Sequence, residues 1–411
     1  MNFCSKVRQL NTRLASTELW GDSKNGHNFG GIFVEPANLV VPEIAKTCAP
    51  FGKVVIFSYS ETLMRQGGRI TSALLDNEFK VENAVFEQDF TLSVEKVCAY
   101  IPVLEDARLI IVLDEELIET ASYLATLKNI PFICVLKRFR INRLTASVVK
   151  IKNGEKTDCF TANAKRYIVF DGENIFESDD FIVETYSYSA SKLLSLMDYR
   201  IRLAITGERP NKKAYDCARS ALLKIFPLLD KLSENKISII ENLLTLELAD
   251  SCSGDTLLSQ SASAIASSIY CCGEPISSVV ELLCALIISE AYGLTINSIG
   301  QPITMPPDYG ERAEFISDKM GIPENQVLSG YKKQINLLVA RKNKLSSLFE
   351  KLKAEISSVE NTLKKAFDKV KELQDFNSID TDLLAKATLC SGDLPNSING
   401  MTVARERGFI K

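Results

Sequence analysis

A turn rich in carboxylates follows an apolar strand pattern in the first third of the chain. Residues 113–116 read Leu-Asp-Glu-Glu, between the β-branched run 109–113 and a helical pattern that ends before a second β-branched run at 130–135. Two parallel strands joined by a helix form the unit that binds nucleotides at the carboxyl ends of its strands. The turn of such a unit is normally rich in glycine, so Asp114 and Glu115 argue against a phosphate site.

A run of basic residues follows the second strand. Residues 137–143 read Lys-Arg-Phe-Arg-Ile-Asn-Arg, which brings Lys137 and Arg138 to the same sheet edge as Asp114 and Glu115. These cations pair with the carboxylates and close an empty cleft, form a new site for a phosphate, nucleotide or acidic partner, or remain solvated. Two carboxylates about 4 Å apart repel by about 4 kcal/mol at an effective dielectric of 20, so a phosphate there requires an intervening cation.

Two further residues limit the chemistry of the chain. Asp198 stands in an apolar helical pattern, and burying an unpaired carboxylate is costly. We therefore expect it to pair with Arg200 or Arg202, or to face a wet cleft. His27 is the single histidine of the sequence. Because histidine is the usual general base and metal ligand, the chain has little access to histidine chemistry.

Composition indicates a folded, two-domain protein. The chain has 411 residues, of which 46% are hydrophobic and 24% charged. A net charge of −4 gives no reason to expect nucleic acid as a partner. We expect no membrane span, because no apolar run reaches the roughly 18 residues required, and we see no secretory signal at the start. The eleven cysteines have no regular spacing, which predicts reduced thiols and a cytoplasmic location.

The order of predicted elements indicates an α/β fold class: an N-terminal Rossmann-like parallel-sheet domain, then an all-helical C-terminal domain, with a ligand cleft between them. We place the domains at 1–182, with 1–30 as a peripheral extension, and at 183–411. Strands are expected at 32–34, 53–59, 81–86, 109–113, 130–135, 146–151 and 167–169. Helices are expected at 39–48, from the end of the second strand to about 75, at 92–101, 186–204, 212–232, 237–250, 256–270, 277–292 and 310–320.

A lysine-rich helical pattern covers residues 332–375, with apolar residues at steps of three and four. One interpretation is a pair of packed helices of the second domain. The other is a protruding coiled coil that makes the protein a homo-oligomer.

Three segments resemble the dehydroquinate synthase-like superfamily, which includes iron-containing alcohol dehydrogenases and glycerol dehydrogenases. Residues 118–125, IETASYLA, and 130–135, IPFICV, are similar to the family's IDTAKYLA and IPFISV. Residues 196–200, LMDYR, resemble its apolar-Asp-aromatic-basic helix segment, and Gly207-Glu208 follows at the usual distance. The resemblance is strongest to sn-glycerol-1-phosphate dehydrogenases and extends from Gly31 to Ala291. It implies NAD(P) and a divalent metal (zinc, iron or nickel) as cofactors.

The resemblance also implies where those cofactors bind, and the motifs differ there. The family's Gly-Gly-Gly turn aligns with Leu113, Asp114 and Glu115, and its small Pro-Thr-Thr type loop aligns with the loop that starts at Lys137 and Arg138. Asp198 takes the position of the acidic metal ligand.

The two histidine ligands of the family align near Ala264 and Ser278, and neither position carries a histidine. Thiolates bind zinc well, and four cysteines surround the region: Cys252, Cys271, Cys272 and Cys284. Adjacent Cys271 and Cys272 are poorly spaced for one metal, so packing is the commoner explanation.

We therefore predict a diverged glycerol-1-phosphate dehydrogenase-like protein without nucleotide or metal binding, with a non-catalytic binding or assembly role and a small anionic ligand as a candidate partner. The alternative is an active NAD(P)-dependent oxidoreductase that reduces a dihydroxyacetone phosphate-like or polyol substrate. A third interpretation is a redirected lyase or synthase that uses the same cleft without nicotinamide.

Overall fold

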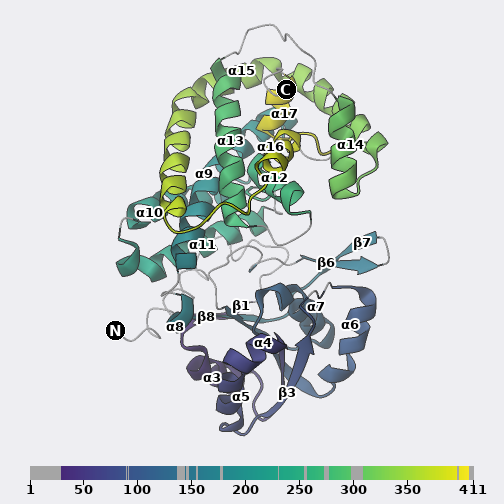
Figure 1. The fold of residues 1–411 in the computed structure, drawn as a ribbon, viewed down its shortest axis with the longest axis vertical. Coiled ribbons are helices and arrows are strands. Elements are labelled where there is room, and N and C mark those ends of the chain that lie inside the picture. The colour runs from purple at the N-terminus through teal and green to yellow at the C-terminus, as the bar shows by residue number, and fades with distance from the viewer. Residues whose placement is uncertain are drawn as a thin grey trace. The chain divides into compact units, whose positions relative to one another are not determined.

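The computed structural model describes residues 29–88, 90, 92–136, 144, 148–153, 156–175, 179–229, 231–253, 257–272, 277–297, 309–395 and 398–406. The chain divides into two compact units, Met1–Phe181 and Ile182–Lys411, and Figure 1 shows the sheet in the first and a set of helices in the second. His27, Lys137 and Arg138 lie outside the described residues, so the expected pairing of Lys137 and Arg138 stays a prediction, as does the cleft between domains.

A six-stranded sheet with every neighbouring pair parallel forms the centre of the first unit. In the order β1-β8-β5-β4-β2-β3, its strands are Phe29–Glu35, Arg166–Asp171, Phe132–Leu136, Ala107–Val112, Lys53–Tyr59 and Lys80–Phe86. The apolar runs of β4 and β5 lie in the middle of the sheet, where side chains on both faces are buried. The α/β prediction is confirmed. Strand β1 starts at Phe29, so the last two residues of the expected extension 1–30 belong to the sheet.

Helices and short turns connect these strands. They are α3 (Ala37–Cys48), α4 (Ser60–Thr62), the π-helix η1 (Leu63–Gly67), α5 (Gly68–Leu75), α6 (Val94–Tyr100), η2 (Pro102–Leu104), η3 (Glu115–Leu117), α7 (Ile118–Lys128) and α8 (Gly172–Ile175). A separate hairpin pairs β6 (Val148–Asn153) with β7 (Lys156–Thr161) in antiparallel register. Sequence patterning missed β7 because its alternating polar residues carry a weak apolar signal.

Nine helices make up the described part of the second unit, which contains no strand. They are α9 (Asp179–Thr206), α10 (Lys212–Leu229), α11 (Leu232–Cys252), α12 (Ala262–Cys271), α13 (Ser278–Asn297), α14 (Tyr309–Met320), α15 (Glu324–Lys371), α16 (Thr381–Cys390) and α17 (Gly400–Glu406). The expectation of an all-helical second part is confirmed. The short helices α16 and α17 were not predicted.

The lysine-rich stretch forms one continuous helix of 48 residues, α15. From Leu345 onward it buries Leu345, Leu352, Ile356, Val359 and Leu363 in the core of the second unit. The expectation of two packed helices was therefore wrong in number, because no glycine or proline interrupts residues 332–371.

The core helix α13 contains a longer apolar stretch than we expected from the sequence. Residues Ser278–Ile296 are long and apolar enough to cross a membrane by length and composition, with a mean hydropathy of 1.8. Glu281 and Glu290 interrupt this stretch, so it contains no uninterrupted apolar run of about 18 residues. Yet 61% of the window is buried inside the structure, and core helices of soluble proteins meet the same criterion. Its apolar side chains pack with those of α9 and α15.

Candidate functional site

The turn after β4 is organised by Asp114, whose backbone is extended at φ −117° and ψ 128°. Its Oδ2 accepts a hydrogen bond of 2.8 Å from the backbone N–H of Tyr59, and its Oδ1 accepts one of 2.6 Å from the hydroxyl of Thr62. Tyr59 ends β2 and caps α4, and Thr62 is the last residue of α4. Asp114 therefore places a fixed negative charge at the point where α4 begins.

This arrangement fills a site that could otherwise receive a phosphate. Helix N-termini at the carboxyl edge of a parallel sheet attract anions, because their backbone N–H groups point outward. Leu113, at the first glycine position of the expected motif, is buried. A Cβ atom at Gly67 would lie 3.3 Å from Leu113 Cδ1, so the leucine packs into the space that Gly67 leaves.

A second aspartate also accepts a hydrogen bond from a backbone N–H at the start of a helix, at the end of another strand. Asp171 ends β8, and its Oδ1 accepts a hydrogen bond of 3.4 Å from the N–H of Ala37, the first residue of α3. Its Oδ2 accepts one of 2.6 Å from Gln66 Nε2. The sequence analysis did not single out Asp171, although it stands at the end of an apolar run, as Asp114 does.

In the second unit, Asp198 lies on α9 and is 1% exposed. Its Oδ1 accepts hydrogen bonds from the hydroxyl of Tyr292 (2.7 Å) and the N–H of Gly400 (2.6 Å). Its Oδ2 accepts one of 2.6 Å from the N–H of Ala262. Ala262 and Gly400 are the first residues of α12 and α17, so three helices deliver donors to one carboxylate on a fourth. Burial raises the pKa of Asp198, while these donors and the charge of Arg202 act to lower it.

The expected arginine partners form hydrogen bonds to other residues. Arg200 pairs with Glu355, and Arg202 bonds to Gln260 Oε1 (2.9 Å) and Glu208 Oε2 (2.8 Å). The charge of Arg202 does act on Asp198, but the three hydrogen-bond donors described above are not arginines. Backbone N–H groups and a phenol satisfy the buried carboxylate instead, and local sequence offers no sign of donors so distant in the chain.

The C-terminal segment reaches Asp198 because Gly400 lacks a side chain. A Cβ atom at this position would lie 2.3 Å from Tyr292 Cζ and 2.4 Å from its hydroxyl oxygen. The segment is also internally bonded: Asn399 Oδ1 accepts from the N–H of Met401 (3.0 Å), and Thr402 Oγ1 donates to the carbonyl of Gly392 (3.0 Å). Asn399, Met401 and Thr402 are fully buried. Residues 399–402 are thus an integral part of this core.

These residues do not fit a divalent metal. At the expected histidine positions, Ala264 offers no side-chain ligand and the hydroxyl of Ser278 donates to Glu184 (2.6 Å). Both oxygens of Asp198 already accept from N–H and O–H donors, whose positive ends disfavour a cation beside them. Within the part of the chain that the structure describes, no three His, Cys, Asp or Glu side chains converge as a metal site. Cys252, Cys271, Cys272 and Cys284 therefore make no such cluster.

A buried ion pair lies close in sequence to both lost ligand positions. Lys192 Nζ bonds to Glu281 Oε1 (2.8 Å) and Oε2 (2.9 Å), and the hydroxyl of Ser263 donates to Oε1 (3.4 Å). The Lys192 ammonium also lies 4.8 Å from the centre of the Tyr188 ring. Sequence reasoning missed this pair, although a lysine and a glutamate in apolar helices are the expected signal of one.

The parallel sheet followed by a helical unit is the architecture of iron-containing alcohol dehydrogenases. Similar solved structures include maleylacetate reductase from Agrobacterium tumefaciens, at 9% identity and TM-score 0.52, with 92% of this chain and 94% of that chain covered. An iron-containing alcohol dehydrogenase from Corynebacterium glutamicum shows 9% identity and TM-score 0.50, with 92% and 96% covered.

A third is the iron-containing alcohol dehydrogenase of Thermotoga maritima, at 10% identity and TM-score 0.50, with 92% and 96% covered. No protein-family model matches the sequence, and no curated protein matches it either. The likeness at these identities establishes the fold that the resemblance implied, and the glycerol 1-phosphate specificity stays a prediction.

Proposed function

We propose that this chain is a dehydrogenase-fold protein that binds neither a catalytic metal nor a nicotinamide nucleotide and has a non-catalytic binding or assembly role. The observation that carries the proposal is that Asp198 accepts three hydrogen bonds from its own chain, given by Tyr292, Gly400 and Ala262. In metal-dependent hydride transfer, a metal polarises the substrate oxygen. The chain's own donors take three of the roughly four acceptor positions of Asp198, and positions 264 and 278 offer no histidine to complete a site for such an ion.

The carboxyl edge of the sheet supports the nucleotide part of the proposal. A dinucleotide pyrophosphate needs a turn through which backbone N–H groups approach it without side chains in between. Here Asp114 and Asp171 already accept from the N–H groups of Tyr59 and Ala37. A phosphate would have to displace both bonds and meet two carboxylates.

The test is thermal unfolding of the purified full-length protein with NADH, NADPH or zinc at sub-millimolar concentration. The expected result is an unchanged melting temperature with each addition, because a ligand that binds only the folded state would raise it. Metal analysis of the same sample should give well below one zinc, iron or nickel per chain. A dose-dependent rise with NADH or NADPH would overturn the nucleotide part, and stoichiometric metal would overturn the other.

A variant with the glycine turn restored tests whether the side chains of this turn alone prevent nucleotide binding. The variant Asp114→Gly with Glu115→Gly recreates two positions of the family's glycine turn, and Asp76→Gly with Glu78→Gly removes the same charge away from it. Neither variant is expected to respond to NADH, because Asp171 and the Asp198 cluster remain. A response confined to the turn variant would mean that the turn alone blocks the nucleotide.

The alternative is an NAD(P)-dependent oxidoreductase acting on a dihydroxyacetone phosphate-like or polyol substrate, and the fold is its support. The same titrations decide between the two proposals. A small anionic ligand at the basic loop that contains Lys137 and Arg138 belongs to the first proposal, and that loop lies outside the described residues. The first proposal also includes a cytoplasmic location, which is supported by nine described cysteines that are free thiols.

A further inference from the structure

Three connections lie side by side at the amino edge of the sheet in the first unit. Strands β3, β2 and β4 are neighbours, and their first residues are aligned, because Lys53 pairs with both Lys80 and Ala107. Each of these strands is preceded by a residue other than glycine that has a left-handed backbone: Glu78 at φ 64°, Phe51 at φ 57° and Asp106 at φ 61°. The turn that contains Phe51 is therefore the middle one of three.

Phe51 is an unusual residue for such a turn. A bulky side chain rarely adopts a positive φ, because its Cβ crowds the backbone, and such strain clusters at functional positions. The phenyl ring is also 86% exposed, so packing within the chain does not offset the strain. Lys53, the base of this turn, is paired with Glu82 at 2.6 Å. The middle turn thus offers an exposed aromatic ring, which is the composition of an interface anchor.

The two flanking turns share one charge pattern. In each, an exposed carboxylate is followed two residues later by an exposed base: Glu78 by Lys80, and Asp106 by Arg108. None of these four side chains forms an ion pair or hydrogen bond with another residue that the structure describes. Arg108 also lies against the middle turn, since a Cβ atom at Gly52 would be 2.5 Å from Arg108 Cγ. Strands β3 and β4 are about 10 Å apart, because β2 lies between them. Each flanking turn therefore presents both signs of charge.

We propose that this surface, made of Phe51, Glu78, Lys80, Asp106 and Arg108, forms a two-fold contact with the same surface of a second copy of the chain. We call it the amino-edge surface. The two Phe51 rings meet at the axis, and the turn before β3 of one copy faces the turn before β4 of the other. Arg108 then reaches Glu78 of the partner subunit, and Lys80 reaches the partner's Asp106. Each pair forms twice, because in a two-fold contact residue i meets j and j meets i. Equal numbers of acids and bases around one apolar centre make the surface complementary to itself.

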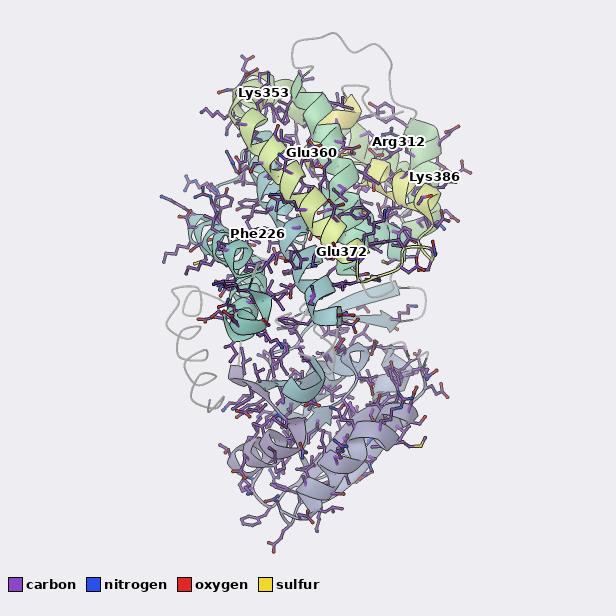
Figure 2. The ribbon with its side chains drawn as sticks, turned by 60° about the vertical axis from the view of Figure 1, so that its left-hand side comes forward. Phe226, Arg312, Lys353, Glu360, Glu372 and Lys386 are labelled. Atoms are coloured by element: carbon purple, nitrogen blue, oxygen red, sulfur yellow. The ribbon has the colours of Figure 1, made fainter. Side chains whose placement is uncertain are left out.

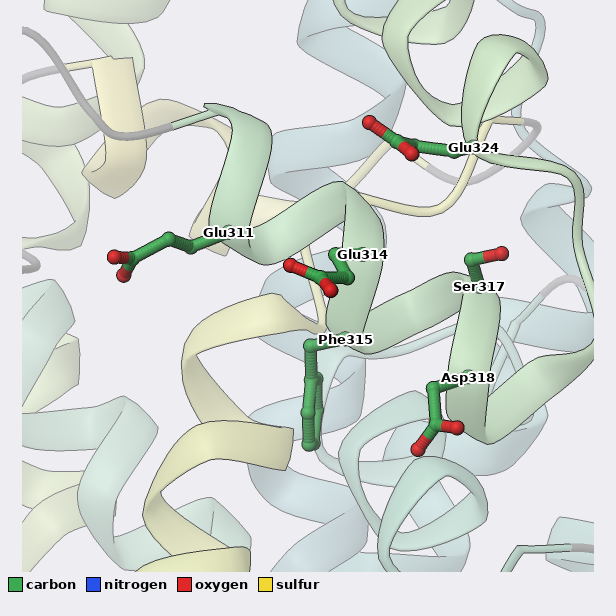
Figure 3. Close-up of a pocket in the computed structure, with 6 residues that line it drawn as sticks. All are labelled: Glu311, Glu314, Phe315, Ser317, Asp318 and Glu324. Carbon is green, nitrogen blue, oxygen red and sulfur yellow. The ribbon is translucent and has the colours of Figure 1, made fainter.

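Two exposed charges of the second unit serve as comparisons. Figure 2 places Lys353 on α15, where its side chain is exposed. Glu314 belongs to a hollow of about 490 Å³, which is lined by Glu311, Glu314, Phe315, Ser317, Asp318 and Glu324. Figure 3 shows that α14 carries all of these except Glu324, which comes from the first turn of α15. The hollow is lined by acids and by no base, so two copies of it repel each other.

Sedimentation velocity of the full-length protein over a range of concentrations tests the contact. The native chain is expected to dimerise as its concentration rises. Arg108→Glu places a carboxylate opposite Glu78 of the partner subunit, and Glu78→Arg places a cation opposite the partner's Arg108. Each variant alone is therefore expected to be monomeric. Lys353→Glu and Glu314→Arg are the matched controls, and both should dimerise like the native chain.

Combining the two reversals is the decisive step. The double variant Arg108→Glu with Glu78→Arg again has opposite charges facing each other across the axis, and so has an equal mixture of the two single variants. Dimers are expected in both samples, although neither single variant associates alone. A native chain that stays monomeric, single variants that still dimerise, or a double variant and mixture that stay monomeric would each overturn the proposal.

Phe51→Gly separates association from folding. Glycine adopts a positive φ without strain, so the melting temperature should stay close to that of the native chain, while self-association weakens at least about tenfold. Val339→Ala is the control, because it shortens a side chain that is 72% exposed on α15 and should leave association unchanged. Undiminished association of Phe51→Gly would overturn the proposal. The contact gives the assembly role of the proposed function a partner. No outcome here depends on nucleotide or metal binding, so its failure leaves the proposed function to its own tests.

Discussion

The phenol of Tyr292 donates a 2.7 Å hydrogen bond to Asp198 across 94 residues of sequence. Together with the N–H groups of Gly400 and Ala262, it joins α13, α17 and α12 to α9 at one buried carboxylate. A charge in such a core is costly unless its hydrogen-bonding capacity is satisfied. The position that resembles a metal ligand has thus become a junction of four helices.

Replacing Tyr292 by Phe should weaken this junction without changing side-chain volume much. The variant loses one donor to a charged acceptor, and we expect unfolding in urea to require about 1.5–3 kcal/mol less free energy. Tyr123→Phe is the control, because its hydroxyl bonds to no described residue. Equal stabilities for Tyr292→Phe and the native protein would mean that Asp198 does not rely on the phenol.

Gly400→Ala tests the close approach of the C-terminal segment. The new Cβ would fall 2.3 Å from the Tyr292 ring, so α17 must move and the bond from its N–H to Asp198 must lengthen. We expect a loss of about 1–3 kcal/mol, with faster hydrogen exchange at Met401 and Thr402. Gly293→Ala is the matched control in α13, because nothing lies within 4 Å of its Cβ position. Helix propensity predicts that this control is neutral or stabilising. Comparable losses in both variants would contradict the proposed packing.

Local patterns in the sequence were sufficient for the sheet. The run Lys53–Tyr59 was predicted with both ends correct, because buried parallel strands read as continuous β-branched and aromatic runs. The departure at Asp114 was also visible, since a carboxylate stood where a turn needs glycine. What the sequence could not reveal is the partner: Tyr59 donates from 55 residues away, and only the parallel pairing of β2 with β4 brings the two together.

The helical site was less predictable for the same reason. The three donors to Asp198 lie 64, 94 and 202 residues away, and two of them are backbone groups with no side-chain signature. The search for a charged partner pointed to arginines on the same helix, where sequence distance is short. Tertiary packing instead brings the N–H of Gly400 to Asp198. The sequence did not reveal this donor, because α17 is too short to be recognised by its periodicity.

The buried Lys192–Glu281 pair predicts a strong asymmetry between single and double variants. Lys192→Met should cost about 3–5 kcal/mol, because it leaves Glu281 charged and uncompensated in the core. The double variant with Glu281→Met should recover most of that loss, since an apolar pair of similar volume needs no counter-charge. Lys364→Met, which breaks an exposed pair with Glu360, should change stability by less than about 1 kcal/mol. Chemical denaturation of the native chain, Lys192→Met, Glu281→Met, the double variant and Lys364→Met measures these changes, and additive losses in the double variant would argue against direct coupling.

Buried thiols and phenols should make the fold sensitive to alkali. Burial raises the pKa of Cys48 from its ordinary 9.0 to about 11, and that of Cys134 and Cys284 to about 12. The pKa values of Tyr188 and Tyr292 are raised well above 10, mainly by burial. The folded state therefore holds protons that the unfolded chain releases, so the free energy of unfolding falls as pH rises from about 9.

Urea titrations at pH 8, 9, 10 and 11 measure that fall. Cys134→Ala removes one of the shifted thiols and should reduce the slope of stability against pH above 9, because that site no longer differs in proton binding between the two states. Cys98→Ala is the control, since its side chain is exposed and should leave the slope as it is. A constant or rising stability between pH 9 and 11 would mean that these groups ionise equally well in the folded protein, and that the cores around them admit water.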